Sequence, residues 1–305
     1  MSRQLRAHFA LAAVALIYGA NYLIAKSVMP DPIGANSFIV LRVLGAALIF
    51  WMIAARQFRW PDKEDMGRFI LCGLTGVAIN QLFFFNGLSL TSPINSAIIM
   101  TSNPILVMLI SAVMVGHRIT PIKVTGVVLG AVGAIALLLL SNMGNHPGVN
   151  LTGDIYILLN SISYAFYLVL VKPLMMKYHP LLVIAWVFTI GLVFVLPFGA
   201  WSASQVPWSS LDSWQWFSVF YVIVFTTFLT YLLNILALHI LTPSIASAYI
   251  YFQPLLAGVF SFLFSIWLQK DYTGDITWGK AACTALIFAG VYLVSKADAS
   301  NLKSK

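Results

Sequence analysis

Apolar stretches of about twenty residues recur along the whole chain and are separated by short polar connections. A helix needs roughly 20 apolar residues to cross the hydrocarbon core of a bilayer. The pattern therefore predicts an all-α polytopic membrane protein with ten transmembrane helices. The predicted helices cover residues 8–28, 34–54, 67–88, 93–115, 121–141, 153–172, 181–200, 214–239, 243–267 and 278–296.

The basic residues are sorted between alternate connections. If the N-terminus is cytoplasmic, the inner loops and ends hold Arg3, Arg6, Arg56, Arg59, Lys63, Arg68, Arg118, Lys123, Lys172, Lys177, Lys296, Lys303 and Lys305. The outer ends and loops then hold only Lys26, Lys270 and Lys280, and Arg42 lies within a helix. Positive charge concentrates on the cytoplasmic side of membrane proteins, so we expect both termini in the cytoplasm.

The composition agrees with this class, because 60% of the residues are hydrophobic and only 9% are charged. The net charge of +8 would suggest nucleic acid as a partner of a soluble protein, but here it is explained by membrane topology. We therefore expect the lipid bilayer and a small-molecule substrate as partners, and no nucleic acid. Cys72 and Cys283 lie in apolar segments, and no metal or cofactor motif is found, so we expect no metal, no cofactor and no enzyme activity.

The two halves of the chain carry matching motifs. The pairs are Thr91-Ser92-Pro93 with Leu241-Thr242-Pro243, Asn103-Pro104 with Gln253-Pro254, Tyr18 and Lys26 with Tyr164 and Lys172, and Gly126 and Gly133 with Cys283 and Gly290. Each half holds five predicted helices, and an odd number turns the second half upside down. We expect two inverted repeats, at residues 1–146 and 147–305. Gene duplication without alternating access is the other explanation.

Several of these motifs resemble the drug/metabolite transporter superfamily, specifically its ten-helix EamA-type branch. They are Tyr18-Gly19-Ala20-Asn21, Ala25-Lys26, Leu41-Arg42, Pro104, Gly116-His117-Arg118-Ile119-Thr120, Gly126, Gly133, Gly153-Asp154, Ser163-Tyr164-Ala165, Tyr167 and Pro254. The resemblance implies a transporter of amino acids, drugs or other metabolites, often an exporter, in a bacterial inner membrane. The chain departs from the family at His117, and similarly near Gln269, where Glu is frequent. We interpret that Glu as a structural group at a helix end.

Polar side chains in mid-helix are costly in lipid unless they face a cavity or a partner. Tyr18, Asn21 and Tyr22 are spaced to share one helix face. The candidate substrate-binding residues, from six predicted helices, are Tyr18, Asn21, Tyr22, Asn80, Gln81, Phe84, Asn103, Tyr164, Tyr167, Tyr231, Asn234, Tyr249 and Gln253. We expect them to line a central cavity, an arrangement that the family resemblance also implies. Interhelical hydrogen bonding is the alternative.

Such a cavity would be rich in tyrosine and amide groups without a fixed charge at its centre, which suits a neutral or zwitterionic organic molecule with an apolar part. Arg42 is a candidate contact for a substrate anion, or it pairs with helix-end carbonyls or extends to the interface. Lys26 and Lys172 are candidate gate residues or interfacial anchors.

All nine carboxylates fall in predicted loops or at helix ends, which favours facilitated diffusion or exchange over proton antiport. The sequence thus predicts a metabolite exporter or facilitator that works by alternating access. A membrane receptor or scaffold that binds a small ligand without transporting it is the alternative. Gly126, Gly130 and Gly133 should pack on the Gly290 side of the last helix, so a monomer should suffice, although a dimer is compatible with the sequence.

Overall fold

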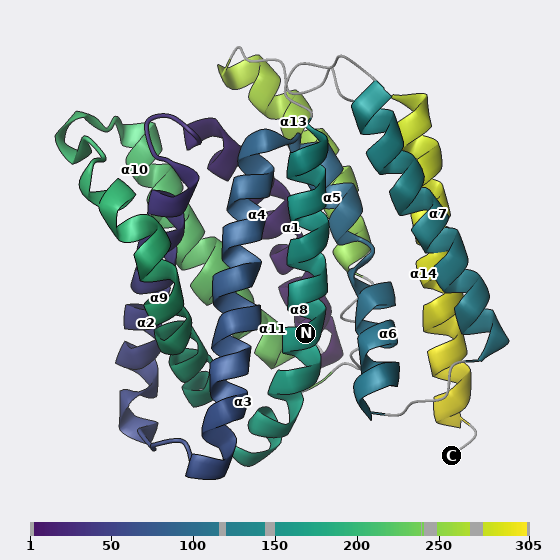
Figure 1. Cartoon of the computed structure of the whole chain (residues 1–305), viewed down its shortest axis with the longest axis horizontal. Helices are drawn as coiled ribbons and strands as arrows, with labels where there is room; N and C mark the ends of the chain where they lie inside the picture. The colour runs from purple at the N-terminus through teal and green to yellow at the C-terminus, as the bar shows by residue number, and fades with distance from the viewer. Residues whose placement is uncertain are drawn as a thin grey trace.

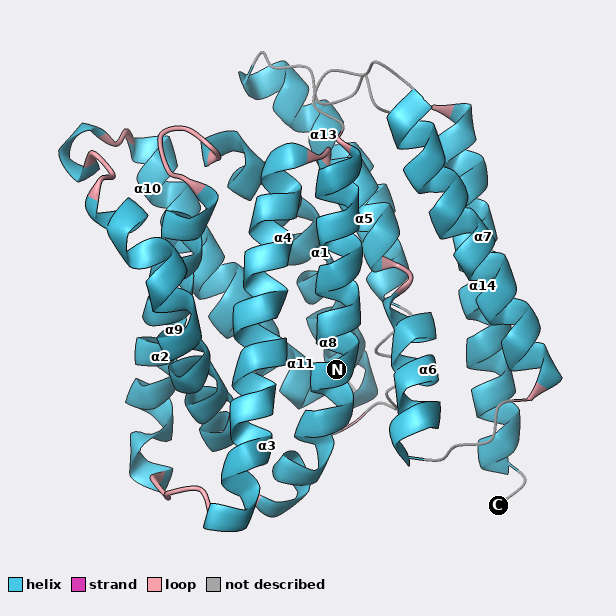
Figure 2. Cartoon of the chain, in the orientation of Figure 1, coloured by secondary structure: helices cyan, strands magenta, loops and turns pink. Residues whose placement is uncertain are grey.

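The computed structural model of the chain describes residues 3–115, 120–143, 150–238, 240, 249–268 and 277–303. The regular elements within these residues are all helical (Figure 2). The features used above that lie outside the described residues are Gly116-His117-Arg118-Ile119, Leu241-Thr242-Pro243, Gln269, Lys270 and Lys305.

The helices follow the predicted apolar segments along the chain (Figure 1). They are α1 (Arg3–Val28), α2 (Ala35–Ala54), α3 (Lys63–Gly73), α4 (Ile79–Leu90), α5 (Pro93–Met100), α6 (Asn103–Val115), α7 (Pro121–Met143), α8 (Leu151–Lys177), α9 (Pro180–Ser204), α10 (Ser213–Phe220), α11 (Thr230–Leu238), α13 (Phe252–Leu268) and α14 (Trp278–Lys303). Two π-helical segments, Leu74–Ala78 and Tyr221–Leu229, join α3 to α4 and α10 to α11.

Among the residues that the structure describes, seven helical stretches are long and apolar enough to cross a membrane. They are Arg3–Val28, Ala35–Gln57, Lys63–Leu90, Pro93–Met114, Leu151–Lys177, Pro180–Ser204 and Ser213–Asn234. Shorter apolar helices cover Pro121–Leu137, Phe252–Trp267 and Trp278–Leu293. The chain is thus an all-helical, multi-pass membrane protein, while the full set of ten crossings stays a prediction.

The break between α5 and α6 lies just before Pro104, as a proline without an N–H group favours. The hydroxyls of Thr101 and Ser102 donate to the carbonyls of Ile98 and Ile99, each at 2.6 Å. The amides of Thr101 and Ser102 also donate to these two carbonyls, at 3.1 and 3.0 Å, so side-chain and backbone bonds together close the last turn of α5. Pro104 occupies the first turn of α6, where a proline is tolerated.

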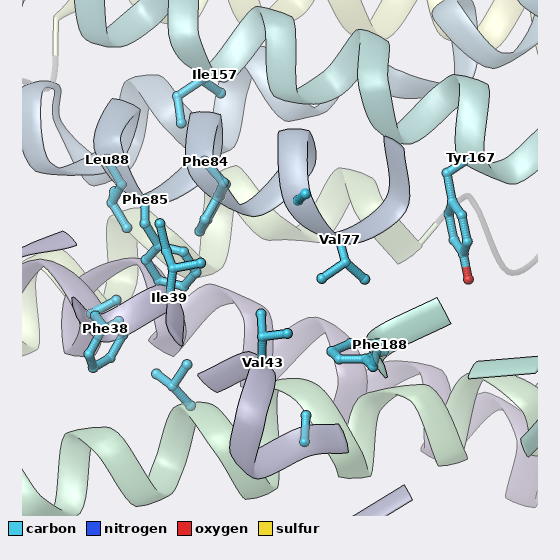
Figure 3. Packing of buried hydrophobic residues seen from close by; sticks show 14 of the residues in the cluster. Phe38, Ile39, Val43, Val77, Phe84, Phe85, Leu88, Ile157, Tyr167 and Phe188 are labelled. Atoms are coloured by element: carbon cyan, nitrogen blue, oxygen red, sulfur yellow. The ribbon is translucent and has the colours of Figure 1, made fainter. Parts of the chain in front are cut away.

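The apolar core is centred on α2, α4 and α9 (Figure 3). Phe85 of α4 meets Phe38 of α2 edge-on, with ring centroids 5.4 Å apart, and it meets Phe84 at 5.0 Å. Phe188 of α9 packs on Phe50 of α2 at 5.2 Å. Tilted and edge-to-face rings interlock in this core and hold α2 against α4 and α9.

The predicted packing of the glycine face near Gly130 on Gly290 is confirmed, because α7 lies beside α14 along its length (Figure 1). A Cβ atom on Gly290 would stand 2.4 Å from the carbonyl oxygen of Gly126 and 2.6 Å from the amide nitrogen of Gly130. Only glycine permits this close approach of two backbones.

Candidate functional site

The centre of the bundle holds a buried arginine. Arg42 lies within α2 and is 7% exposed. Its Nε donates to Thr227 Oγ1 at 2.7 Å, and its Nη1 donates to Gln81 Oε1. The guanidinium carbon lies 5.1 Å from the ring centroid of Phe85, over the ring face, which is a cation–π contact. Arg42 therefore joins α2 to α4 and to the π segment before α11.

The π segment Tyr221–Leu229 orients the partner of Arg42. Thr227 donates its hydroxyl to the carbonyl of Val222, five residues earlier, at 2.8 Å. A π-helical turn offers its carbonyls at this spacing rather than at four residues. The hydroxyl oxygen of Thr227 is thereby left to accept from Arg42.

A chain of amide groups continues from Arg42 to α8. Gln81 Nε2 donates to Asn80 Oδ1 at 2.8 Å, and Asn160 Nδ2 donates to the Asn80 carbonyl at 2.8 Å. These three amides and Arg42 are all buried. Such a network is strong in a low-dielectric interior because each bond polarises the next.

Tyr167 reaches the same region through the other π segment. A Cβ on Gly76 would lie 2.3 Å from the Tyr167 ring, so the absence of a side chain at Gly76 lets the ring pack there. Nearby, the Ser163 hydroxyl donates to the carbonyl of Thr75 at 2.7 Å. The ring of Tyr164 follows, with its centroid 5.9 Å from that of Tyr167.

Helix α1 contributes two tyrosines to the same region. The Tyr22 hydroxyl donates to Gln253 Oε1 at 3.1 Å, and its ring lies 5.8 Å from that of Phe84. The Tyr18 hydroxyl accepts from Thr230 Oγ1 at 3.2 Å. Gln253 stands in the first turn of α13 directly before Pro254, so the predicted amide–proline pair faces α1.

Tyr231 completes this part of the bundle, directly after Thr230 in α11. Tyr231 is additionally framed by aromatic rings at centroid distances of 5.9 and 5.6 Å. We call the set the central cluster, and it consists of Tyr18, Tyr22, Arg42, Asn80, Gln81, Phe84, Asn160, Tyr164, Tyr167, Thr227, Thr230, Tyr231 and Gln253.

Two further candidates have unpaired carbonyl oxygens. The Oδ1 atoms of Asn21 and Asn103 are buried and accept no hydrogen bond in the described structure. The Nδ2 group of Asn103 lies 3.8 Å from the sulfur of Met100. Asn234 is only half-buried, and its side chain forms no hydrogen bond with the described residues. An unpaired buried acceptor is costly, so it calls for an explanation such as a ligand or water.

Three predicted site residues lie elsewhere. The hydroxyl of Tyr249 is 2.8 Å from His8 Nδ1, in a small separate cluster beside Leu11. Lys26 donates to the carbonyls of Leu88, Ser89 and Thr91 at 2.7–2.9 Å, so its ammonium satisfies the carbonyl end of α4. Lys172 is exposed on α8.

The structure also contains a buried carboxylate that the sequence did not indicate. Asp154 lies in the first turn of α8, at a helix end as expected, but its side chain is 0% exposed. It accepts from the Thr91 hydroxyl at 2.5 Å and from Asn95 Nδ2 at 3.1 Å. Its charge also acts on Lys280 of α14. Thr230 of the central cluster and Phe85, the ring that Arg42 packs on, were missed as well, because single Thr and Phe residues in apolar runs carry no distinctive signal.

A charged cluster lies at the predicted cytoplasmic edge. Lys177 Nζ stands 2.6 Å from Asp65 Oδ2 and 2.8 Å from Asp62 Oδ2, and Arg59 pairs with Asp62 at 3.1 Å. Hydrogen bonding to Lys177 lowers the pKa of Asp62 to about 2, with Arg59 adding to the effect. The cluster ties the start of α3 to the end of α8.

Residues 5–139 and 151–296 match the EamA-like transporter family. The chain belongs to the EamA-like transporter family. This assignment agrees with the resemblance found in the sequence and makes the protein a member of a family of membrane transporters. The two matched segments fall on either side of the predicted boundary after residue 146, while the boundary itself stays a prediction.

Two relatives that are named as uncharacterized transporters match three quarters or more of the chain. An uncharacterized transporter of Archaeoglobus fulgidus is 22% identical over 95% of this chain and 97% of its own. The uncharacterized transporter YetK of Bacillus subtilis is 25% identical over 76% of this chain and 72% of its own. A solved crystal structure with 18% sequence identity has a TM-score of 0.56 and covers 96% of both chains, so it shares the fold.

Proposed function

We propose that this EamA-like protein carries a small neutral or zwitterionic organic metabolite, such as an amino acid, across the cell inner membrane by alternating access. It acts as an exporter or facilitator, and both of its termini are cytoplasmic. The observation that carries the proposal is the central cluster, in which tyrosine, amide and guanidinium groups from α1, α2, α4, α8, α13 and the α10–α11 segment meet inside an apolar bundle. Lipid disfavours such groups unless they serve a pathway or a partner.

Two corresponding irregular segments support an inverted repeat. Pro104 and Pro254 are 150 positions apart, and residues 74–78 shifted by 150 fall on 224–228. Both ranges are π-helical in the structure. π-Bulges are rare and concentrate at functional sites, so their correspondence favours two related halves, residues 1–146 and 147–305.

The helix packing supports the same relation. The α4–α8 contact corresponds to the α11–α1 contact when the halves are exchanged, and α6–α8 corresponds to α13–α1. The α2–α9 contact and the α7–α14 contact each join equivalent helices of the two halves, so exchanging the halves leaves these contacts unchanged. An architecture of this kind allows one half to rock against the other around a fixed site. All these contacts lie within one chain, so a monomer is sufficient, and a dimer remains compatible with the proposal.

The mechanism is facilitated diffusion or exchange rather than proton antiport. Among the carboxylates whose burial is described, Asp31, Asp62, Glu64, Asp65 and Asp212 are wholly or partly exposed, and the buried Asp154 lies in the first turn of its helix rather than in the central cluster. Substrate flux in liposomes should therefore proceed without a stoichiometric movement of protons. A proton flux coupled 1:1 to substrate would contradict this mechanism.

The test of transport is efflux from proteoliposomes loaded with a mixed amino-acid and metabolite pool, read by mass spectrometry. The wild type should release at least one component faster than protein-free liposomes. Gln253→Leu should slow that release, because it removes the amide that pairs with Tyr22. A receptor or scaffold, the alternative function, would bind a component without releasing any, and that result would overturn the proposal.

A further inference from the structure

Arg42 is a buried cation whose described partners are all uncharged. Its nitrogens donate to a threonine hydroxyl and to the amide oxygen of Gln81, and its plane lies over a phenylalanine ring. Among the described residues Arg42 forms no salt bridge, unlike Arg59 and Lys177 of the charged cluster. A buried charge in a protein is normally paired with an opposite charge.

Neither snorkelling to the membrane interface nor capping of a helix end accounts for the contacts of Arg42. A snorkelling arginine extends along its helix towards the interface, and a capping arginine donates to helix-end carbonyls. Arg42 instead points across the bundle to side chains of α4 and of the α10–α11 segment. Arg42 lies seven residues after Ala35, the first residue of α2, so it is about 10 Å along the helix axis from the start of that helix.

The guanidinium retains donor capacity after these contacts. An arginine has five N–H donors in a planar fork that matches a carboxylate, and Nη2 donates to no described acceptor. Aromatic surface lies beside it in the ring of Phe85, and Tyr18 bonds to Thr230, one turn after the Thr227 that Arg42 contacts. One turn from Tyr18 along α1, the Oδ1 atom of Asn21 is buried without a donor.

We propose that Arg42 is the specificity-determining residue of the transport site and binds the carboxylate of an amphipathic monocarboxylic acid, free or zwitterionic, whose apolar part lies against the tyrosines of the central cluster. This inference rests on the proposed function and specifies its cargo, since it selects the zwitterions, adds monocarboxylate anions to them, and excludes nucleobases and polyols as the main cargo. The unpaired Asn21 oxygen suits a donor group of the same molecule, such as an ammonium.

The experiment compares matched carboxylates and carboxamides on the purified full-length protein. The probes are phenylacetate with phenylacetamide, 4-methylpentanoate with 4-methylpentanamide, and L-leucine with L-leucinamide. Binding is measured in detergent by thermal-shift titration, and flux is measured in liposomes. In the wild type at least one carboxylate should bind about tenfold or more tightly than its amide, as a charge-assisted hydrogen bond supplies.

Two variants test the role of Arg42. Arg42→Gln should bring the carboxylate-to-amide ratio close to one. Gln81→Glu should place a carboxylate beside Arg42 inside the protein, so it should weaken carboxylate binding by about tenfold while the melting temperature stays the same or rises. The second variant guards against misfolding as the cause of lost binding. Arg59→Gln, at an arginine whose side chain is 55% exposed, is the matched control and should keep the wild-type ratio.

The outcomes separate this inference from the proposed function. Carboxylate preference that depends on Arg42 supports the inference, even if no flux is seen and transport fails. Flux of amides with no carboxylate preference supports transport and overturns the inference. The inference is equally overturned if no carboxylate binds the wild type, or if Arg42→Gln keeps the wild-type ratio.

Discussion

Individual polar residues in apolar helices carried most of the information about the site. Tyr18, Tyr22, Gln81 and Gln253 were predicted from their cost in lipid, and they meet in one region of the structure. Tyr249 was expected among them but pairs with His8 instead. Tyr249 lies in a 3₁₀ turn before α13, so the α-helical spacing that would place it on the same face as Gln253 does not hold.

Burial at helix ends was harder to predict. A carboxylate in a first turn is usually a solvated partner of the helix dipole, and the sequence of α8 offers no reason to expect otherwise for Asp154. Its burial depends on Thr91 and Asn95, which arrive from the α4–α5 connection and from α5. Partners this distant in sequence are set by tertiary packing alone.

Asp154→Ala should destabilise the protein by about 1–3 kcal/mol, because the Thr91 hydroxyl and the Asn95 amide would lose their acceptor inside the bundle. Asp154→Asn, which retains an acceptor oxygen, should lose less. Melting temperatures in detergent provide the comparison. Equal stability of the alanine variant and the wild type would contradict the buried role of this side chain.

The charged cluster at Asp62 predicts a pH dependence. Its folded pKa of about 2 is below the ordinary aspartate value, so the stabilisation is present above that value and is lost as the pH falls towards 2. The melting-temperature difference between wild type and Asp62→Asn should therefore be largest near neutral pH and shrink between about pH 4 and pH 2. A difference that does not change over this range would contradict the pairing with Lys177.

At the scale of elements, helix positions followed from hydropathy but helix irregularities did not. The break before Pro104 has a local cause, because the sequence places a proline in the middle of the predicted helix 93–115. The stretch 67–88 was predicted as one continuous helix, whereas the structure inserts the π segment Leu74–Ala78. That segment is accommodated by the Tyr167 ring on Gly76, a contact between distant parts of the chain.

The α7–α14 contact gives a matched pair of glycine substitutions. Gly290→Ala should destabilise the protein by about 1–3 kcal/mol, because its methyl group would meet backbone atoms that cannot move aside. Gly258→Ala in α13, where nothing lies within 4 Å of the new Cβ, should be neutral or stabilising by up to about 1 kcal/mol. Thermal unfolding in detergent measures both. Similar effects at the two sites would argue against the close packing of α7 on α14.

At the scale of the whole molecule, the sequence predicted the class and the family, and the described helices agree with both. The orientation in the membrane rests on the sorting of Lys and Arg, a property that the coordinates of a single chain do not encode. The substrate is likewise beyond prediction from residue types, because tyrosines and amides suit many small molecules.

Single cysteines introduced at the helix ends test the orientation. In a background without Cys72 and Cys283, Gln57→Cys should resist a membrane-impermeant maleimide in intact cells and react after permeabilisation. Gln205→Cys, an exposed position after α9, should react in intact cells. Reversed labelling would place the termini outside the cytoplasm.

The most direct test of the account is counterflow in liposomes. Vesicles containing the purified protein are loaded with an unlabelled compound identified by the efflux screen, and uptake of the same labelled compound is followed over time. A site reached from each side in turn predicts a transient accumulation above equilibrium, which Arg42→Gln or Gln253→Leu should reduce. Binding of that compound to the central cluster without counterflow would contradict alternating access around this site.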